Sequence, residues 1–263
     1  MLVKRSLVPA LERGLGIIEL LEEEKDGLTF SELQIKSGIP KPSLARILNI
    51  LEDYDYVRTF SDGKYKLGFK LLSLGYSVYS QLDLVSEAKP FLLKLVELTR
   101  ETAELAVLDR GEILYLDKID SPEPMRLVAR IGSRYKTLHC TAVGKVFLAY
   151  MGEEFLKEYI SKVGLIKFTE NTIVDEDILR KELDEVRTQE YAFDDEEVRI
   201  GVRRIASPVF GSFKGLVAVI GIAGPTFRIT LDKKEELGEI VKEVAMGLSV
   251  KLGYESEIVG KIL

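Results

Sequence analysis

The sequence is poor in the residues from which most metal and redox sites are built. Its 263 residues include one cysteine, Cys140, and one histidine, His139, and they include no tryptophan. A single cysteine excludes an intramolecular disulfide, and one cysteine with one histidine is too few for the usual structural zinc sites. We therefore expect neither a metal nor a cofactor in this chain.

Long apolar runs are also missing. No segment reaches the length of a membrane span without a charged residue, and residues 1–10 lack the sustained apolar stretch of a signal peptide. We expect a cytoplasmic protein that has no membrane partner. Hydrophobic residues make up 46% of the chain, which suits two domains of ordinary size, each with its own core.

The net charge of -6 argues at first against a nucleic-acid partner, because a polyanion is attracted only to positive potential. The charges are unevenly distributed, however. Residues 36–70 contain seven basic and four acidic side chains, whereas residues 22–26 are mostly acidic. A basic face within the first part of the chain is therefore compatible with DNA binding.

The first helix is predicted from the apolar periodicity of residues 9–24. The Asp26-Gly27 pair is expected to end it, because glycine is a frequent helix terminator. The buried stripe is expected to include Leu11, Leu15, Ile18 and Leu21. An amphipathic helix of this kind needs a partner to cover its apolar side.

A tight helix-turn-helix is predicted next. Thr29 and Glu32 have the spacing of a capping box, which begins a short second helix that ends near Gly38. Pro40 suits the first position of a third helix. The apolar stripe of that third helix is formed by Leu44, Ile47, Leu48 and Leu51. The polar residues between these positions point outward.

A β-hairpin is predicted from two short alternating runs, residues 56–60 and 64–67, which flank an Asp62-Gly63 turn. Three helices followed by a hairpin are typical of a winged helix-turn-helix, whose third helix enters the major groove of DNA. We predict that residues 1–68 form this domain and bind a double-stranded DNA operator.

Arg46 and Asn49 can pair with base edges, whereas the basic side chains can neutralise phosphates. The residues predicted to contact DNA are Lys41, Pro42, Ser43, Arg46, Asn49, Arg58, Lys64 and Lys66. Any one of them alone is more often a solvated surface residue. The order of the elements therefore carries the prediction.

Residues 69–82 predict a linker helix with more apolar surface than a solvated helix tolerates. The simplest partner is the same helix of a second chain, since a twofold dimer presents two recognition helices to two half-sites of an operator. A role within one chain remains the alternative.

Residues 83–263 predict a second domain of mixed helices and strands. Helices are expected at residues 84–100, 140–151, 153–162, 175–190 and 231–252, and strands at 102–108, 112–119, 125–131, 204–210 and 215–223. Adjacent hairpins imply a largely antiparallel sheet with helices packed on it. The fold class is therefore α+β, with two domains.

Cys140 beside His139 raises the alternative of an enzyme with a thiol nucleophile, because a helix start can lower a thiol pKa. Neighbours in sequence seldom face one another, and there is no second histidine to serve as the base. The acidic residues 194–197 are more often a solvated turn than a paired-carboxylate site. We predict that the chain is not an enzyme.

Several motifs, taken together, resemble the IclR family of transcriptional regulators. They are residues 11–15 (LERGL), 38–41 (GIPK), 65–68 (YKLG), 138–145 (LHCTAVGK), 191–197 (YAFDDEE), 201–203 (GVR) and 224–225 (GP). The resemblance implies that residues 83–263 form a domain similar to GAF and profilin-like sensors. It also implies a repressor whose DNA binding is controlled by a small acidic metabolite, and a homodimer that can pair into a tetramer.

The resemblance also implies which residues line the effector pocket. They are Leu127, Tyr135, Ala142, Val143, Asp194, Arg204, Gly221 and Ala223. The backbone N–H groups of Thr141, Ala142 and Val143, at the start of a predicted helix, form a further site for an anion.

Relatives that sense small oxo-acids tend to have a cysteine at the position of Arg204 and serines at those of Gly221 and Ala223. Arg204 can bind a carboxylate in two-pronged fashion, and the two smaller residues leave more room. We therefore expect a larger organic acid, such as an aromatic or a sugar acid. One alternative is that Arg204 pairs with Asp194 or Glu197 and has no direct role in ligand binding. Another is a second domain that only mediates assembly or protein binding.

Overall fold

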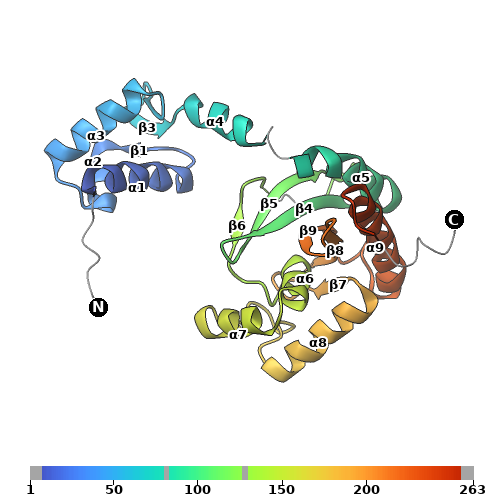
Figure 1. Ribbon diagram of the computed structural model, residues 1–263. Coiled ribbons are helices and arrows are strands. Elements are labelled where there is room, and N and C mark those ends of the chain that lie inside the picture. Colours follow the sequence, from blue (N-terminus) through green and yellow to red (C-terminus); the bar gives the residue numbers. More distant parts are fainter. Residues whose placement is uncertain (1–7, 80–82, 126–129, 256–263) are drawn as a thin grey trace. The chain divides into compact units, whose positions relative to one another are not determined.

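The computed structural model describes residues 8–79, 83–125 and 130–255 (Figure 1). The chain divides into two units, residues 1–82 and 83–263. The elements of the first unit are α1 (Pro9–Glu23), β1 (Leu28–Thr29), α2 (Phe30–Ser37), α3 (Lys41–Asp53), β2 (Val57–Thr59), β3 (Lys64–Leu67) and α4 (Phe69–Tyr79). The prediction of a winged helix-turn-helix is confirmed.

The local signals act as the sequence predicts. Thr29 Oγ1 accepts a hydrogen bond from the Glu32 N–H at 3.3 Å, and Glu32 Oε2 accepts one from the Thr29 N–H at 2.8 Å, which completes the capping box. Gly38 ends α2 with a φ of 66°, a left-handed conformation that suits glycine. Pro40 was predicted at the first position of α3 but is its N-cap, and the helix begins one residue later at Lys41.

Two features of the first unit differ from prediction. The buried residues of α1 are Gly14, Ile17 and Leu21, whereas Leu11 and Leu15 are 59% and 53% exposed. The glycine faces Ile47 on α3, which turns the apolar stripe to one side of the predicted position. The short strand β1 was missed; it pairs with β3 and makes the wing a three-stranded sheet.

The second unit is built on an antiparallel sheet with the strand order β6-β5-β4-β9-β8-β7. Its elements are α5 (Asp83–Thr99), β4 (Thr102–Asp109), β5 (Glu112–Ile119), β6 (Arg134–Tyr135), α6 (Ala142–Tyr150), α7 (Glu153–Lys162), α8 (Glu176–Gln189), β7 (Ala192–Asp195), β8 (Val202–Phe210), β9 (Leu216–Pro225), η1 (Leu231–Lys233) and α9 (Lys234–Lys251). The α+β prediction is confirmed.

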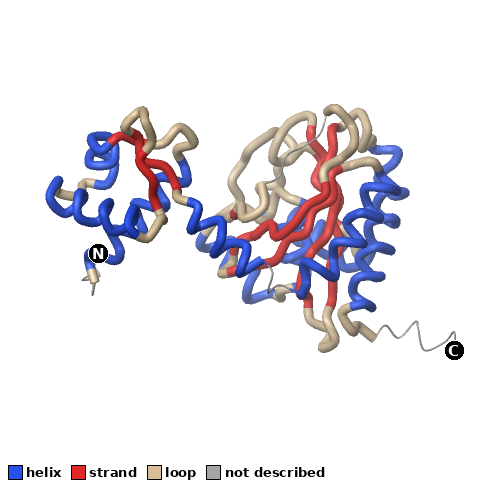
Figure 2. The backbone as a smooth tube through the Cα atoms, turned by 90° about the horizontal axis from the view of Figure 1, so that it is seen from above, coloured by secondary structure: helices blue, strands red, loops and turns tan. Residues whose placement is uncertain are grey.

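Helices pack against the strands of this sheet (Figure 2). α5 contacts β4 and β9, α9 contacts β8 and β9, and the two helices contact each other. α6 contacts β7, β8 and β9, and α8 packs against α6. Buried residues of α6 and α8, among them Val146, Phe147 and Leu183, share a core with Ala192 and Ala206 of the sheet. α6 is therefore held directly over β7 and β8.

Two strands were missed by the sequence prediction. β6 and β7 were missed because each is too short to show alternation. The expected strand at residues 125–131 falls mostly on residues 126–129, which lie outside the described residues, and Met125 and Ile131 are not in strands. Among the described residues, none of the helices combines the length and apolar character needed to cross a bilayer.

Candidate DNA-binding surface and effector site

The recognition helix α3 buries one side and exposes a polar one. Leu44 and Leu48 are in the core of the unit. Among the predicted DNA contacts on this helix, Lys41, Pro42, Arg46 and Asn49 are exposed and Ser43 is half-buried. Arg46 Nε donates to the Pro42 carbonyl at 3.2 Å, which lays the guanidinium along the exposed face.

The basic residues of the wing are not equivalent. Arg58 forms an ion pair with Asp55, and its guanidinium lies 4.4 Å from the ring centroid of Phe69. Lys66 Nζ lies 5.2 Å from the ring centroid of Phe60, and Lys64 is half-buried. Because the charge of Arg58 is already compensated, the lysines are the better candidates for phosphate contacts.

The start of α6 offers two free backbone donors rather than three. Thr141 is the N-cap: its Oγ1 accepts the Gly144 N–H at 2.9 Å, and its own N–H donates to the Leu138 carbonyl at 3.3 Å. The prediction of a free Thr141 N–H was therefore wrong. In the described part of the chain, the N–H groups of Ala142 and Val143 have no partner.

A buried tyrosine holds the loop that leads into α6. Tyr159 Oη accepts the Leu138 N–H at 2.9 Å and the His139 N–H at 3.3 Å. It lies 2.6 Å from His139 Nδ1, while Nε2 lies 3.0 Å from the Ile166 carbonyl. A carbonyl only accepts, so the network assigns the imidazole proton to Nε2, and the Tyr159 hydroxyl donates to Nδ1.

Burial lowers the pKa of His139 from its ordinary value of 6.5. The unfolded chain therefore binds a proton more readily than the folded one, and the stability contributed by neutral His139 is lost as the pH falls below about 6.5. His139→Gln should flatten the fall in unfolding free energy on the acid side, measured by urea denaturation between about pH 5 and pH 8. Identical slopes for variant and wild type would contradict this assignment.

Cys140 is fully buried, with its sulfur 4.0 Å from the Thr137 carbonyl. Burial raises its pKa to about 11, so the thiol stays protonated. Both ring nitrogens of His139 are occupied by Tyr159 and Ile166, as described above. The histidine therefore does not activate the thiol.

Arg204 meets an acidic partner across neighbouring strands. Asp194 on β7 pairs with Arg204 on β8, and Arg204 Nη1 donates to Asp194 Oδ2 at 2.8 Å. The aspartate is fully buried, whereas the arginine side chain is 21% exposed. The alternative interpretation, an acidic partner for Arg204, is thus present in the structure, with Asp194 as that partner. Among the described residues, Arg204 makes no second hydrogen bond, and so its remaining donors are available.

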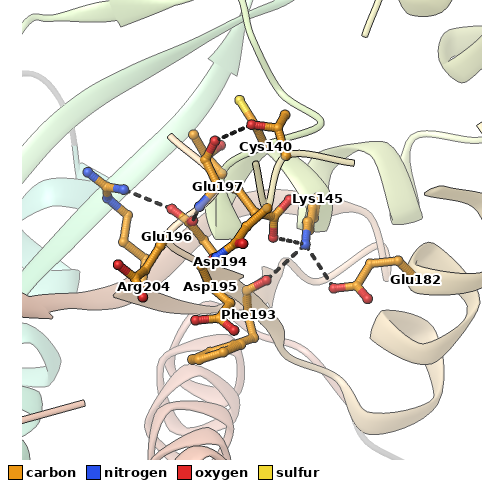
Figure 3. Close-up of polar contacts among 12 residues, drawn as sticks. Cys140, Lys145, Glu182, Phe193, Asp194, Asp195, Glu196, Glu197 and Arg204 are labelled. Atoms are coloured by element: carbon orange, nitrogen blue, oxygen red, sulfur yellow. Dashed lines mark hydrogen bonds and ion pairs between the residues drawn. The ribbon is translucent and has the colours of Figure 1, made fainter. Parts of the chain in front are cut away.

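The acidic turn after β7 is buried, which the sequence did not predict. Figure 3 shows Arg204 on one side of Asp194 and Lys145 on the other. Asp194 Oδ1 accepts the Glu197 N–H at 2.8 Å, and Glu197 accepts a hydrogen bond from Lys145 at 2.5 Å. Burial raises the pKa of Glu197 to about 7 in spite of the lysine. These contacts connect the Asp194–Arg204 pair with α6.

Lys145 completes this network from inside α6. Its side chain is 1% exposed, and Nζ also donates to Glu182 on α8 and to the Phe193 carbonyl, each at 2.9 Å. A lysine on a predicted helix gives no sign of burial, because lysine side chains are normally solvated. Only the packing of α6 against α8 and β7 reveals it.

The remaining predicted pocket residues are distributed around this face. Ala142, Val143 and Ala223 are buried. Tyr135 is 46% exposed and lies edge-on to Tyr115, with ring centroids 5.7 Å apart. Leu127 lies outside the described residues.

Glycine at position 221 is explained by backbone packing and not by extra room in the pocket. A Cβ at this position would lie 2.4 Å from the Ile205 carbonyl oxygen, so the close approach of β8 to β9 requires glycine. Sequence reasoning also missed Glu104, a 5% exposed carboxylate on β4. A charged residue amid the apolar run of residues 103–107 was the available signal.

Comparison with known families matches both units. Residues 10–59 match the IclR helix-turn-helix domain, and residues 76–250 match the bacterial transcriptional regulator IclR C-terminal domain. The chain is 37% identical over 240 residues to the HTH-type transcriptional regulator KdgR of Dickeya chrysanthemi, covering 91% of this chain and 78% of that protein. It is 32% identical over 248 residues to the HTH-type transcriptional repressor AllR of Escherichia coli strain K12, covering 94% and 91%.

A solved structure is similar to this chain over nearly its whole length. The crystal structure of the Thermotoga maritima IclR superimposes with a TM-score of 0.78 at 31% identity, covering 94% of this chain and 99% of that one. The similarity therefore extends over both units.

Proposed function

Because the chain belongs to the IclR family of transcriptional regulators, we propose that it is a repressor that binds a DNA operator as a homodimer and is controlled by a small acidic metabolite. The family and its relatives are DNA-binding transcriptional regulators and not enzymes. The name of AllR as a repressor supports the direction of control. The observation that carries the DNA-binding part is the exposed polar face of α3.

The apolar surface of α4 supports dimerisation. Phe69 and Leu72 are 65% and 73% exposed, and Leu74 is 40% exposed. Apolar side chains gathered on one helix are costly to leave in water, and a twofold partner would cover them. Two recognition helices on one dimer bind two half-sites and gain affinity from being linked.

The effector part is supported by two kinds of unused hydrogen-bond donor, one at the start of α6 and one on β8. The free N–H groups of Ala142 and Val143 lie at the positive end of α6. Arg204 adds the donors that Asp194 leaves unused. A carboxylate is the ligand group that both kinds of donor prefer.

The test begins with duplex DNA selected from random sequence by the full-length protein. Binding to the selected operator and to a shuffled duplex is measured by fluorescence anisotropy, with and without organic, aromatic and sugar acids. We expect a preference for the selected operator and its loss with at least one acid. Absence of a sequence preference would contradict the repressor proposal. An operator preference that no acid alters, together with no thermal stabilisation by any acid, would favour a second unit that only mediates assembly or protein binding.

Removal of Arg204 is expected to weaken binding of the carboxylate effector at least about tenfold, because a charge-assisted hydrogen bond is lost. Arg204→Met alone would leave Asp194 buried without its cation. We therefore compare Asp194→Asn with Asp194→Asn/Arg204→Met by titration calorimetry. Equal affinities of these two variants would show that Arg204 does not contact the ligand.

A further inference from the structure

The sheet face that carries Arg204 also carries a buried carboxylate that the proposed function leaves unused. Glu104 lies on β4 and pairs with Gly221 on β9. Gly221 pairs in turn with Ala206 on β8, two residues beyond Arg204. Paired residues point to the same side of a sheet, and so do alternate residues of one strand. Glu104 and Arg204 therefore stand on the same face, on either side of β9.

The strand between them contributes no large side chain. β9 provides Gly221 and Ala223 at these positions, and the close approach of Ile205 forbids a Cβ on the glycine. Across the described part of the chain, no hydrogen bond or ion pair within 4.0 Å joins Glu104 to Arg204. Each charge nevertheless shifts the pKa of the other. The two groups are close enough to interact but do not touch.

The charges around this position do not balance. Arg204 is bound to the fully buried Asp194 at 2.8 Å. Burial raises the pKa of Glu104, whereas the charge of Arg204, the charge of Lys118 and a hydrogen bond with Tyr115 lower it, with Arg204 first among them. Lys118 is itself bound to Asp120 at 2.6 Å. One guanidinium therefore serves two buried carboxylates.

A plain carboxylate bound at Arg204 would add a third negative charge to this cluster. Like charges in a poorly hydrated site repel strongly. A ligand that also donates a hydrogen bond to Glu104 reduces this repulsion, because its donor faces the carboxylate next to which its own charge must lie.

We propose that Glu104 determines effector specificity by accepting a hydrogen bond from a hydroxyl group of the ligand, so that the effector is a hydroxylated carboxylic acid. This inference rests on the proposed acid-sensing function and narrows its ligand class. The competing role for Glu104 is purely structural, as the hydrogen-bond partner of Tyr115 and the cross-strand neighbour of Lys118 on β5. In that role Glu104 affects stability but not the choice of ligand.

The experiment measures a preference ratio in the full-length protein. Affinities are determined by calorimetry for acids that differ in a hydroxyl group: glycolate and acetate, lactate and propionate, gluconate and hexanoate, and 4-hydroxybenzoate and benzoate. We expect the hydroxylated member of the responding pair to bind about 30-fold more tightly to the wild type. In Glu104→Leu the ratio should fall to within about threefold, because the acceptor is gone. The unsubstituted acid should bind this variant at least as tightly as the wild type.

Two further variants keep the proposal falsifiable. Glu104→Gln retains shape and one acceptor oxygen, and it should give an intermediate ratio even if the leucine variant fails to fold. Lys118→Met removes the cross-strand cation and should keep the wild-type ratio. Equal affinities within every pair, an unchanged ratio in both Glu104 variants, or an equal loss in Lys118→Met would overturn the role of Glu104 while leaving acid sensing intact. Absence of binding by all of these acids would overturn the proposed role of Glu104 and also the acid-sensing part of the proposed function.

Discussion

Lys145→Met is expected to destabilise the second unit by about 3–5 kcal/mol, because breaking a buried ion pair leaves uncompensated charge behind. Glu197 is 5% and Glu182 26% exposed in their side chains, and the Phe193 carbonyl would also lose its donor. Urea denaturation of the full-length chain measures the loss as a shift in the midpoint of the transition of that unit. The methionine keeps the apolar stem of the side chain, so the loss reports chiefly on the charge.

Matched variants separate the network from general effects of charge removal. Lys157→Met on α7 removes a lysine that is 58% exposed and paired with Glu153 and Glu154, and it should change stability little. Glu197→Gln added to Lys145→Met should recover part of the loss, because one orphaned charge disappears. If Lys145→Met were no more harmful than Lys157→Met, the buried network would not stabilise the fold.

Arg46→Ala and Asn49→Ala are each expected to weaken binding to the selected operator by about 10- to 100-fold, since a paired contact to a base edge contributes about 1–3 kcal/mol. The loss should be accompanied by relaxed preference at one operator position. Arg46 and Asn49 lie on the exposed face of α3, so neither substitution opens the core. Anisotropy titrations on the selected operator and on single-base variants measure both effects.

Two lysines provide the comparison for this prediction. Lys64→Ala on the wing should weaken binding to all duplexes alike and reduce the dependence of affinity on salt, as expected for a phosphate contact. Lys36 on α2 forms an ion pair with Glu24, and Lys36→Ala should leave operator binding unchanged. Wild-type affinity and specificity in Arg46→Ala and Asn49→Ala would show that α3 does not read bases.

Local signals in the sequence were sufficient for the three helices and the hairpin of the DNA-binding unit. The Thr29–Glu32 capping box, the left-handed Gly38 and the glycine turn at Gly63 each act within a few residues. The exposed face of α3 follows from helical periodicity alone. The family motifs, in turn, predicted that the second unit resembles sensor domains. These parts of the prediction did not require knowledge of any distant contact.

Tertiary structure decided which groups are buried and what they bind. Thr141 uses its N–H in the loop and its hydroxyl as a helix cap, and so only the next two residues remain as donors. α1 is rotated by its approach to α3 at Gly14. Periodicity along one segment reports neither effect, because each depends on the partner against which the segment packs.

The charged cluster shows this limit most clearly. Glu104, Lys145, Asp194 and Arg204 are separated in sequence by 10 to 100 residues. They come together because β9 lies between β4 and β8 and because α6 packs over β7 and β8. The sequence determined the fold class, the recognition helix and the family. Strand order and register determined which charges meet, since a shift of one residue would turn each strand's side chains to the opposite face.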